Sequence, residues 1–236
     1  MPELKGAIID LSHPVESGMP HWPDDPQTGL AVCRTLEQDG YRLNRLVIGE
    51  HSGTHIGAPS HFNRNQATVD RLGAGKLIVP AVKINLDAAA GENRDFLLQT
   101  EHILGWEEQH KKIESGLVLI HTGWSRFWSD PEMYFGLENG MMHFPGVSES
   151  AARFLAQQRG IIGLGIDTAG IDGGMSNDFA AGRCLAAHGI YHLENLANLN
   201  SLPDENFTVF IGALPIVNGH GSPCRVLAVI QAVYDF

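Results

Sequence analysis

Short apolar runs separated by turn residues recur along the whole sequence, and this alternation limits the folds open to the chain. Runs of β-branched and aliphatic residues bounded by turn signals are typical of buried strands, whereas longer segments with helical spacing predict helices. We predict strands over residues 6–11, 30–35, 41–49, 77–84, 116–121, 160–166, 190–193, 207–214 and 225–232, and helices over residues 100–109, 148–158 and 177–188. Strands outnumber helices and partly alternate with them, so the sequence predicts an α/β fold with a mixed sheet and helices.

The composition favours one soluble domain. A chain of 236 residues with 43% hydrophobic content can bury a large core, and no repeat or linker divides it, so we expect a single domain over residues 1–236. A net charge of -11 disfavours nucleic acid or a membrane surface as a partner. The first six residues lack the basic and apolar regions of a signal peptide, and no apolar run approaches a membrane span.

The three cysteines indicate the compartment. Cys33, Cys184 and Cys224 are far apart, odd in number and form no C-x-x-C pair. This pattern is typical of reduced thiols rather than of a disulfide framework. We therefore expect a cytoplasmic protein.

The segment from His51 to Phe62, with the sequence HSGTHIGAPSHF, places three of the twelve histidines in one turn region rich in Gly and Pro. Neutral imidazole is a common ligand of zinc and manganese and a common general base near neutral pH. We predict that His51 and His55 meet at a metal ion, and that His61 is either a third ligand or a free base that takes a proton from water. A solvated loop remains the alternative, although it suits one isolated histidine better than three.

A second candidate is Glu194, which follows the apolar segment 190–193. A buried carboxylate needs a partner such as a metal ion or an arginine. If the segment is extended, its period of two places His192 and Glu194 on one face. The alternative is a glutamate at the start of a helix, and the residues alone do not decide between the two.

Other polar and aromatic residues carry weaker predictions. Asp167 ends a strand before a Gly-rich turn, where an aspartate more often caps the turn than binds a metal. Trp22, Phe62 and Trp124 could form flat apolar walls for a ring-shaped small-molecule substrate, although tryptophan is more often part of the core.

Several ordered blocks together resemble the cyclase-like metal-dependent hydrolases. The blocks are Asp10-Leu-Ser-His-Pro14, Met19-Pro-His-Trp22-Pro23, the histidine segment, His121-Thr-Gly-Trp124, Gly165-Ile-Asp-Thr168, the segment ENLANL that begins at Glu194, and Gly221-Ser-Pro-Cys-Arg225. The resemblance implies a swivelling β/β/α fold, a divalent zinc or manganese ion and a homo-oligomer, either a dimer or a tetramer. It also implies hydrolysis of a non-peptide C–N bond in a small amide, N-formyl, lactam or lactone substrate, as in arylformamidases.

The same resemblance implies roles for individual residues. His51, His55 and Glu194 match metal ligands, and His61 matches a histidine with a catalytic or metal-binding role. In the implied mechanism, a metal ion activates water and His61 shuttles protons.

Two positions depart from the family pattern. Gly57 stands where the family has an aspartate ligand, and Gly182 stands where it has a further histidine. These changes favour one metal ion held by His51, His55, His61 and Glu194, with His188 or His192 as a compensating ligand. Two other functions remain open: a metal-free small-molecule-binding or scaffold protein, and a metal-dependent lyase or isomerase.

Overall fold

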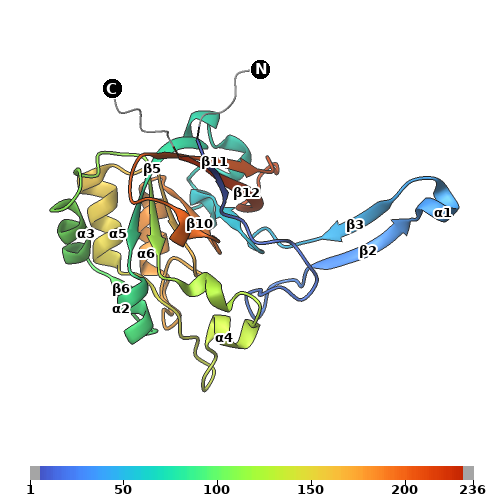
Figure 1. Cartoon of the computed structure of the whole chain (residues 1–236), viewed down its shortest axis with the longest axis horizontal. Coiled ribbons are helices and arrows are strands. Elements are labelled where there is room, and N and C mark those ends of the chain that lie inside the picture. The colour runs from blue at the N-terminus through green and yellow to red at the C-terminus, as the bar shows by residue number, and fades with distance from the viewer. Residues whose placement is uncertain (1–5, 231–236) are drawn as a thin grey trace.

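Strands and helices alternate along residues 6–230, which the computed structural model describes (Figure 1). The strands are β1 (Ile8–Asp10), β2 (Gly29–Arg34), β3 (Leu43–Val47), β4 (His55–Gly57), β5 (Ile78–Asn85), β6 (Leu97–Leu98), β7 (Leu117–His121), β8 (Gly146–Val147), β9 (Gly163–Ile166), β10 (Tyr191–Glu194), β11 (Phe207–Ala213) and β12 (Gly221–Ile230). The α-helices are α1 (Leu36–Asp39), α2 (Asp87–Glu92), α3 (Thr100–Glu107), α4 (Pro131–Phe135), α5 (Glu149–Phe154) and α6 (Ala180–Ala187). A π-helical turn, Leu155–Arg159, prolongs α5. The short 3-10 turns are Pro59–His61, Val69–Arg71, Ala74–Lys76, Trp124–Phe127 and Leu199–Ser201.

Eight of the strands form one mixed sheet that closes on itself. Their order is β1-β12-β11-β5-β7-β9-β10-β4. The long strand β12 pairs with β11 along one edge and with both β1 and β4 along the other. Because β4 also pairs with β10, the two ends of the sheet are joined.

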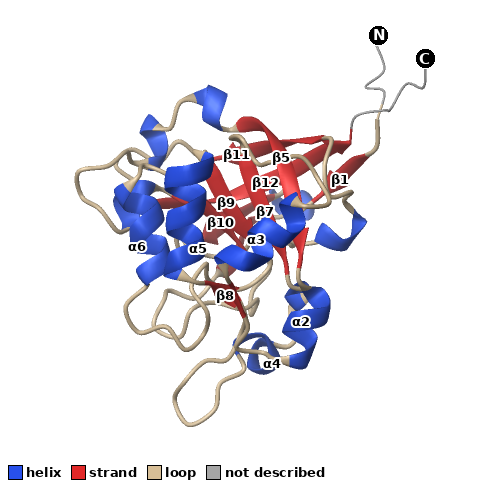
Figure 2. Ribbon diagram, turned by 90° about the vertical axis from the view of Figure 1, so that its left-hand side faces the viewer, coloured by secondary structure: helices blue, strands red, loops and turns tan. Residues whose placement is uncertain are grey.

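Both faces of the central strand β7 are buried. Leu117 and Leu119 belong to the apolar cluster on one face, whereas Val118 and Ile120 belong to the cluster that includes residues of α3, α5 and α6. Figure 2 shows these three helices covering one face of the sheet. A strand buried on both faces has no polar alternation, which explains why β7 is a continuous apolar run.

The hairpin of β2 and β3, with α1 at its tip, projects from the body of the molecule (Figure 1). We call residues 29–47 the arm. Most of its side chains are exposed, and Val32 is 72% exposed. Its exposed large apolar residues are Leu30, Val32, Leu36, Tyr41, Leu43, Leu46 and Val47.

The predicted α/β class with a mixed sheet is confirmed, and each predicted strand or helix overlaps an observed one. The histidine segment differs from the expected turn, because residues 55–57 form β4 through pairing with β10 and β12. The helix predicted from residue 177 begins at Ala180, since Phe179 adopts the left-handed conformation. The last strand begins earlier than predicted, at Gly221, and residues 231–232 of that prediction lie outside the described residues.

Two predictions drawn from composition are only partly tested. No helix within residues 6–230 is long and apolar enough to cross a membrane. The predicted single domain over residues 1–236 stays a prediction, and the segment read for a signal peptide lies largely outside the described residues.

Candidate active site

Two neighbouring strands carry the candidate metal-binding side chains. In the antiparallel ladder of β4 and β10, His55 is opposite Glu194, and Gly57 is opposite His192. Residues directly opposite one another project to the same face of a sheet, and so do residues two apart on one strand. All four positions therefore share one face. The observed strand also resolves the alternative for Glu194, which lies at the end of β10 and does not start a helix.

Asn195 fastens the histidine segment to the end of β10. It adopts a left-handed conformation with φ of 56°, which asparagine tolerates better than most residues. Its side-chain Nδ2 donates to the carbonyl of Gly53 at 2.8 Å, and its own carbonyl accepts from Thr54 Oγ1 at 2.6 Å. The hydroxyl of Tyr134 donates to Asn195 Oδ1 at 2.7 Å, which fixes the amide.

The tautomer of His55 is set by its surroundings. Its Nδ1 lies 2.9 Å from the carbonyl of Gly53, which can only accept, so Nδ1 carries the proton. The lone pair on Nε2 is then left 3.2 Å from Oε2 of Glu194, and within residues 6–230 this nitrogen has no hydrogen-bond partner. A proton or a cation between these two atoms would stabilise the contact.

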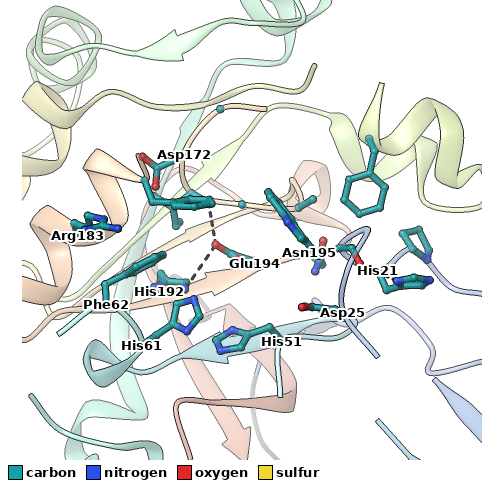
Figure 3. Close-up of a pocket in the computed structure, with 18 residues that line it drawn as sticks. His21, Asp25, His51, His61, Phe62, Asp172, Arg183, His192, Glu194 and Asn195 are labelled. Carbon is teal, nitrogen blue, oxygen red and sulfur yellow. Dashed lines mark hydrogen bonds and ion pairs between the residues drawn. The ribbon is translucent and has the colours of Figure 1, made fainter. Parts of the chain in front are cut away.

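His51 and His61 extend the cluster, as Figure 3 shows. The His51 ring lies 5.1 Å from that of His55 and 4.0 Å from that of His61, between centroids. Among the described residues, Nε2 of His51 is also buried without a hydrogen-bond partner. His61 ends the 3-10 turn Pro59–His61, which Pro59 begins.

The protonation states suit ligands. Burial alone would raise the pKa of Glu194, but the facing imidazoles of His192 and His55 outweigh it and lower the pKa to about 2. Burial lowers the pKa of His51 to about 2 and that of His192 to about 4. At neutral pH the site therefore holds a carboxylate and neutral imidazoles, which are the forms that bind a metal ion.

The donor set fits a divalent cation. Within residues 6–230, no three His, Cys, Asp or Glu side chains form a group that could hold a metal ion as they stand. The buried Nε2 atoms of His51 and His55 nevertheless have no hydrogen-bond partner among these residues, and a proton is disfavoured on His51 by burial. Imidazole nitrogen with carboxylate oxygen is a donor set that suits both zinc and manganese.

A cavity of about 400 Å³ opens beside the cluster. Its aromatic walls are Trp22, Phe62, Phe135 and Phe179, and its polar lining includes His21, Asp25, His51, His61, Asp172, Arg183, His192, Glu194 and Asn195. The volume and the mixture of flat apolar walls with a few polar groups are typical of a small-molecule site. Trp22 and Phe62 therefore line this cavity, and their contact with a substrate stays a prediction.

Trp124 lies elsewhere and does not line this cavity. It is buried in an aromatic cluster, where its indole Nε1 donates to the carbonyl of Tyr134 at 2.8 Å. Its backbone N–H donates to Asp167, which also accepts from the backbone N–H and the hydroxyl of Thr122. The structural interpretation of Asp167 is confirmed, and Trp124 is a core residue rather than a cavity wall.

The second altered position, Gly182, has no room for a side chain. A Cβ atom there would lie 2.7 Å from Cε2 of Phe62 and 3.1 Å from Oδ2 of Asp172. His188 does not compensate for it, since this residue caps the far end of α6, with Nε2 3.3 Å from the amide of Gln157. The structure thus separates the two compensating candidates, because His192 lines the cavity and His188 does not.

Sequence reasoning missed several aromatic and polar cavity residues, namely His21, Asp25, Phe135, Asp172, Phe179, Arg183 and Asn195. Asn195 follows Glu194 directly, so its place beside a predicted metal ligand could have identified it as a cavity residue. Nothing in the local pattern separates Arg183 from any other exposed arginine of a helix.

Similarity to known proteins identifies the family of this chain. Residues 9–173 match the family described as "Putative cyclase". The chain is 32% identical to isatin hydrolase of Roseibium aggregatum over 216 residues, which cover 87% of this chain and 82% of that protein. It is 28% identical to kynurenine formamidase of Bacillus cereus over 226 residues, covering 95% and 97% of the two chains.

A solved structure agrees with this assignment. An isatin hydrolase bound to the product analogue thioisatinate superposes with a TM-score of 0.91 at 28% identity, over 95% of this chain and 92% of that one. The chain belongs to the cyclase family, as its sequence blocks indicated.

Proposed function

We propose that this protein is a metal-dependent hydrolase that opens the C–N bond of a small cyclic amide on an aromatic ring. The observation that carries the proposal is that His51, His61 and Glu194 line an aromatic-walled cavity, with Nε2 of the buried His55 3.2 Å from Oε2 of Glu194. The similarity to isatin hydrolases, one of them bound to a product analogue, supports the substrate class. N-formyl aromatic amines are the second substrates to test, because kynurenine formamidase is also a relative.

His51, His55 and Glu194 would hold the divalent ion, either zinc or manganese. When bound, such an ion polarises the substrate carbonyl and makes water more acidic. The chain itself orients these donors. The Gly53 carbonyl fixes the His55 ring, and the backbone N–H of Ile171 donates to Oε1 of Glu194 at 2.9 Å. Outer partners of this kind hold ligands in place and typically account for a 10- to 100-fold effect on affinity or activity.

His61 is the proposed proton carrier. Burial lowers its pKa, so its ring is neutral and able to accept a proton near pH 7. In the reaction the water oxygen bonds to the carbonyl carbon, and His61 takes the proton that the water loses. The C–N bond then breaks, and His61 delivers that proton to the leaving nitrogen.

The remaining cavity residues orient the substrate. Trp22, Phe62 and Phe179 supply flat surfaces for an aromatic ring. Arg183 lines the same cavity, and no ion pair joins it to another of residues 6–230. We propose that its guanidinium binds the carboxylate that ring opening creates.

The test is hydrolysis in isotopically labelled water. Protein loaded with zinc or with manganese is incubated with isatin, and separately with N-formylkynurenine, in water enriched in oxygen-18. The proposal expects one solvent oxygen in the product acid, detected by mass spectrometry. Product without solvent oxygen would indicate a lyase or isomerase, and tight ligand binding without turnover would indicate a binding protein.

Assembly and location complete the proposal. The exposed apolar side chains of the arm support a homo-oligomer in which a second copy covers the arm. The three free thiols of Cys33, Cys184 and Cys224 support a cytoplasmic location. The -11 charge remains the reason to expect neither nucleic acid nor a membrane surface as a partner.

A further inference from the structure

We propose that His192 is a metal ligand of this protein, and that Gly57 is glycine because the His192 imidazole occupies the space of a side chain at position 57. The inference rests on the metal site proposed above. In this arrangement, His192 of β10 supplies the metal donor that a side chain at position 57 of the neighbouring strand β4 would otherwise supply.

The packing at Gly57 is the first argument. A Cβ atom built on Gly57 would lie 1.9 Å from Nε2 and 2.3 Å from Cε1 of His192, well inside van der Waals contact. The two residues are opposite each other in the ladder of β4 and β10, so their side chains share one face. The backbone of Gly57 is not left-handed, so the imidazole rather than backbone strain excludes a side chain there.

The position of the His192 ring is the second argument. Its Nε2 lies 3.6 Å from Oε1 of Glu194, while Oε2 of the same carboxylate lies 3.2 Å from Nε2 of His55. Donor atoms bound at about 2.0–2.2 Å to one tetrahedral ion are about 3.4 Å apart. Two imidazole nitrogens therefore lie near the oxygens of one carboxylate, and His192 is close enough to this carboxylate to join its metal site. His192 is only 4% exposed, and its remaining access is to the cavity.

The other altered position provides the contrast. The space over Gly182 is filled by the Phe62 ring, which cannot bind a metal, and by Asp172, whose oxygens already accept from the N–H groups of Ala181 and Gly182. One missing donor is therefore replaced by a nitrogen, and the other by an apolar ring. This arrangement indicates a single ion with His51, His55, His192 and Glu194 around it.

The test is an exchange of donors between the two strands. Four variants are compared with the natural protein: His192→Ala, Gly57→Asp, the double variant Gly57→Asp/His192→Ala, and His188→Ala as the control. The dissociation constant for Zn²⁺ is measured on metal-stripped protein by competition with a chromophoric chelator. The visible spectrum of the Co²⁺-loaded protein reports the ligand set, and circular dichroism reports folding.

We expect His192→Ala to weaken Zn²⁺ binding by more than the roughly 10- to 100-fold effect of removing an outer partner, and to change the Co²⁺ spectrum. His188→Ala should leave both unchanged. Gly57→Asp alone should weaken binding, because the new side chain and the imidazole require the same space. The double variant should recover most of the affinity, because the carboxylate can then enter the vacated position.

Unchanged Zn²⁺ affinity and an unchanged Co²⁺ spectrum in folded His192→Ala would overturn this inference and leave the proposed function intact. Failure of the natural protein to bind Zn²⁺, Mn²⁺ or Co²⁺ would overturn both. If His192→Ala does not fold, His192→Gln removes the imidazole at similar volume and is subject to the same two outcomes.

Discussion

The arm and the histidine segment are close neighbours in the chain, yet both reverse the usual pattern of burial. One exposes apolar side chains, and the other buries polar ones. The arm, residues 29–47, exposes apolar side chains such as Val32 and Leu46. The segment 51–62 buries polar ones, and His55 is 1% exposed. Apolar exposure and unpaired buried polar atoms are both costly. We infer from this difference that each region depends on a partner, and that the two partners differ in kind.

The two regions are also held in different ways. The arm is a two-stranded hairpin, which is marginally stable alone, and it is fastened to the body only at its base. The histidine segment is fixed by β4 pairing with two strands and by the amide of Asn195. We therefore expect the arm to depend on a second protein surface and the site to depend on a cation.

The largest expected effect follows from removing the metal ion. A chelator should reduce hydrolysis to the uncatalysed rate and lower the melting temperature, since an ion at 100 times its dissociation constant adds about 2.7 kcal/mol of stability. Calorimetry and a turnover assay measure the two effects. Adding back zinc or manganese is the control, and full activity in chelator would show that the site needs no cation.

A change at His61 tests the proton carrier separately from the metal. We expect His61→Gln to lower kcat by about 10²- to 10⁴-fold, because the proton transfers lose their carrier. The zinc content should remain near that of the natural protein, as metal analysis can show. Loss of the ion together with activity would instead identify His61 as a ligand, which was the alternative at the sequence level.

The pH profile gives a smaller effect with a defined sign. Burial lowers the pKa of His61 below its usual 6.5, and the nearby Glu194 carboxylate, which raises this pKa, only partly offsets the effect. The ring therefore stays neutral at pH 6.5 and can act as a base. The value of kcat/KM should therefore be level near pH 7 and decline only below pH 6.5, by about tenfold per pH unit once below the shifted pKa. Rate measurements across this range check it, and an acidic limb centred above 6.5 would contradict it.

The smallest expected effect on catalysis comes from the arm. Val32→Asp/Leu46→Asp should shift the protein towards monomer in analytical ultracentrifugation, because charges are placed on the surface that a second copy would cover. Val217→Asp is the control, since Val217 is 76% exposed but lies outside the arm. Away from such an interface, a surface substitution changes stability by about 0.5 kcal/mol or less. Identical oligomeric states in all three proteins would remove the arm from the interface.

Much of the architecture could be predicted from local pattern. The segment 116–121 indicated a strand, which is β7, and the Ser148 start with its Ala-rich continuation indicated α5, where Ser148 Oγ accepts from the N–H of Ala151. These signals depend on neighbours in sequence, so they were reliable. The strand at His55–Gly57 escaped prediction because its hydrogen-bond partners are contributed by β10 and β12.

The site residues also differ in whether local sequence was enough to predict them. Spacing and residue type indicated His51, His55, His61 and Glu194, whose geometry suits the predicted roles, and those roles remain predictions. The sequence could not show whether Trp124 belongs to the core or lines the cavity, because a tryptophan suits both places equally well. Its indole N–H is satisfied by Tyr134 inside the aromatic cluster.

The sequence by itself determined which donors are present, the alternation that builds an α/β sheet, and the family, which ordered blocks along the chain identify. It also showed that Gly57 carries no donor. Only the tertiary structure decided that His192 lies over Gly57 while the Phe62 ring fills the space at Gly182. The reason is strand register, because pairing of β4 with a strand far along the chain determines which side chains share one small volume, and no local pattern encodes that pairing.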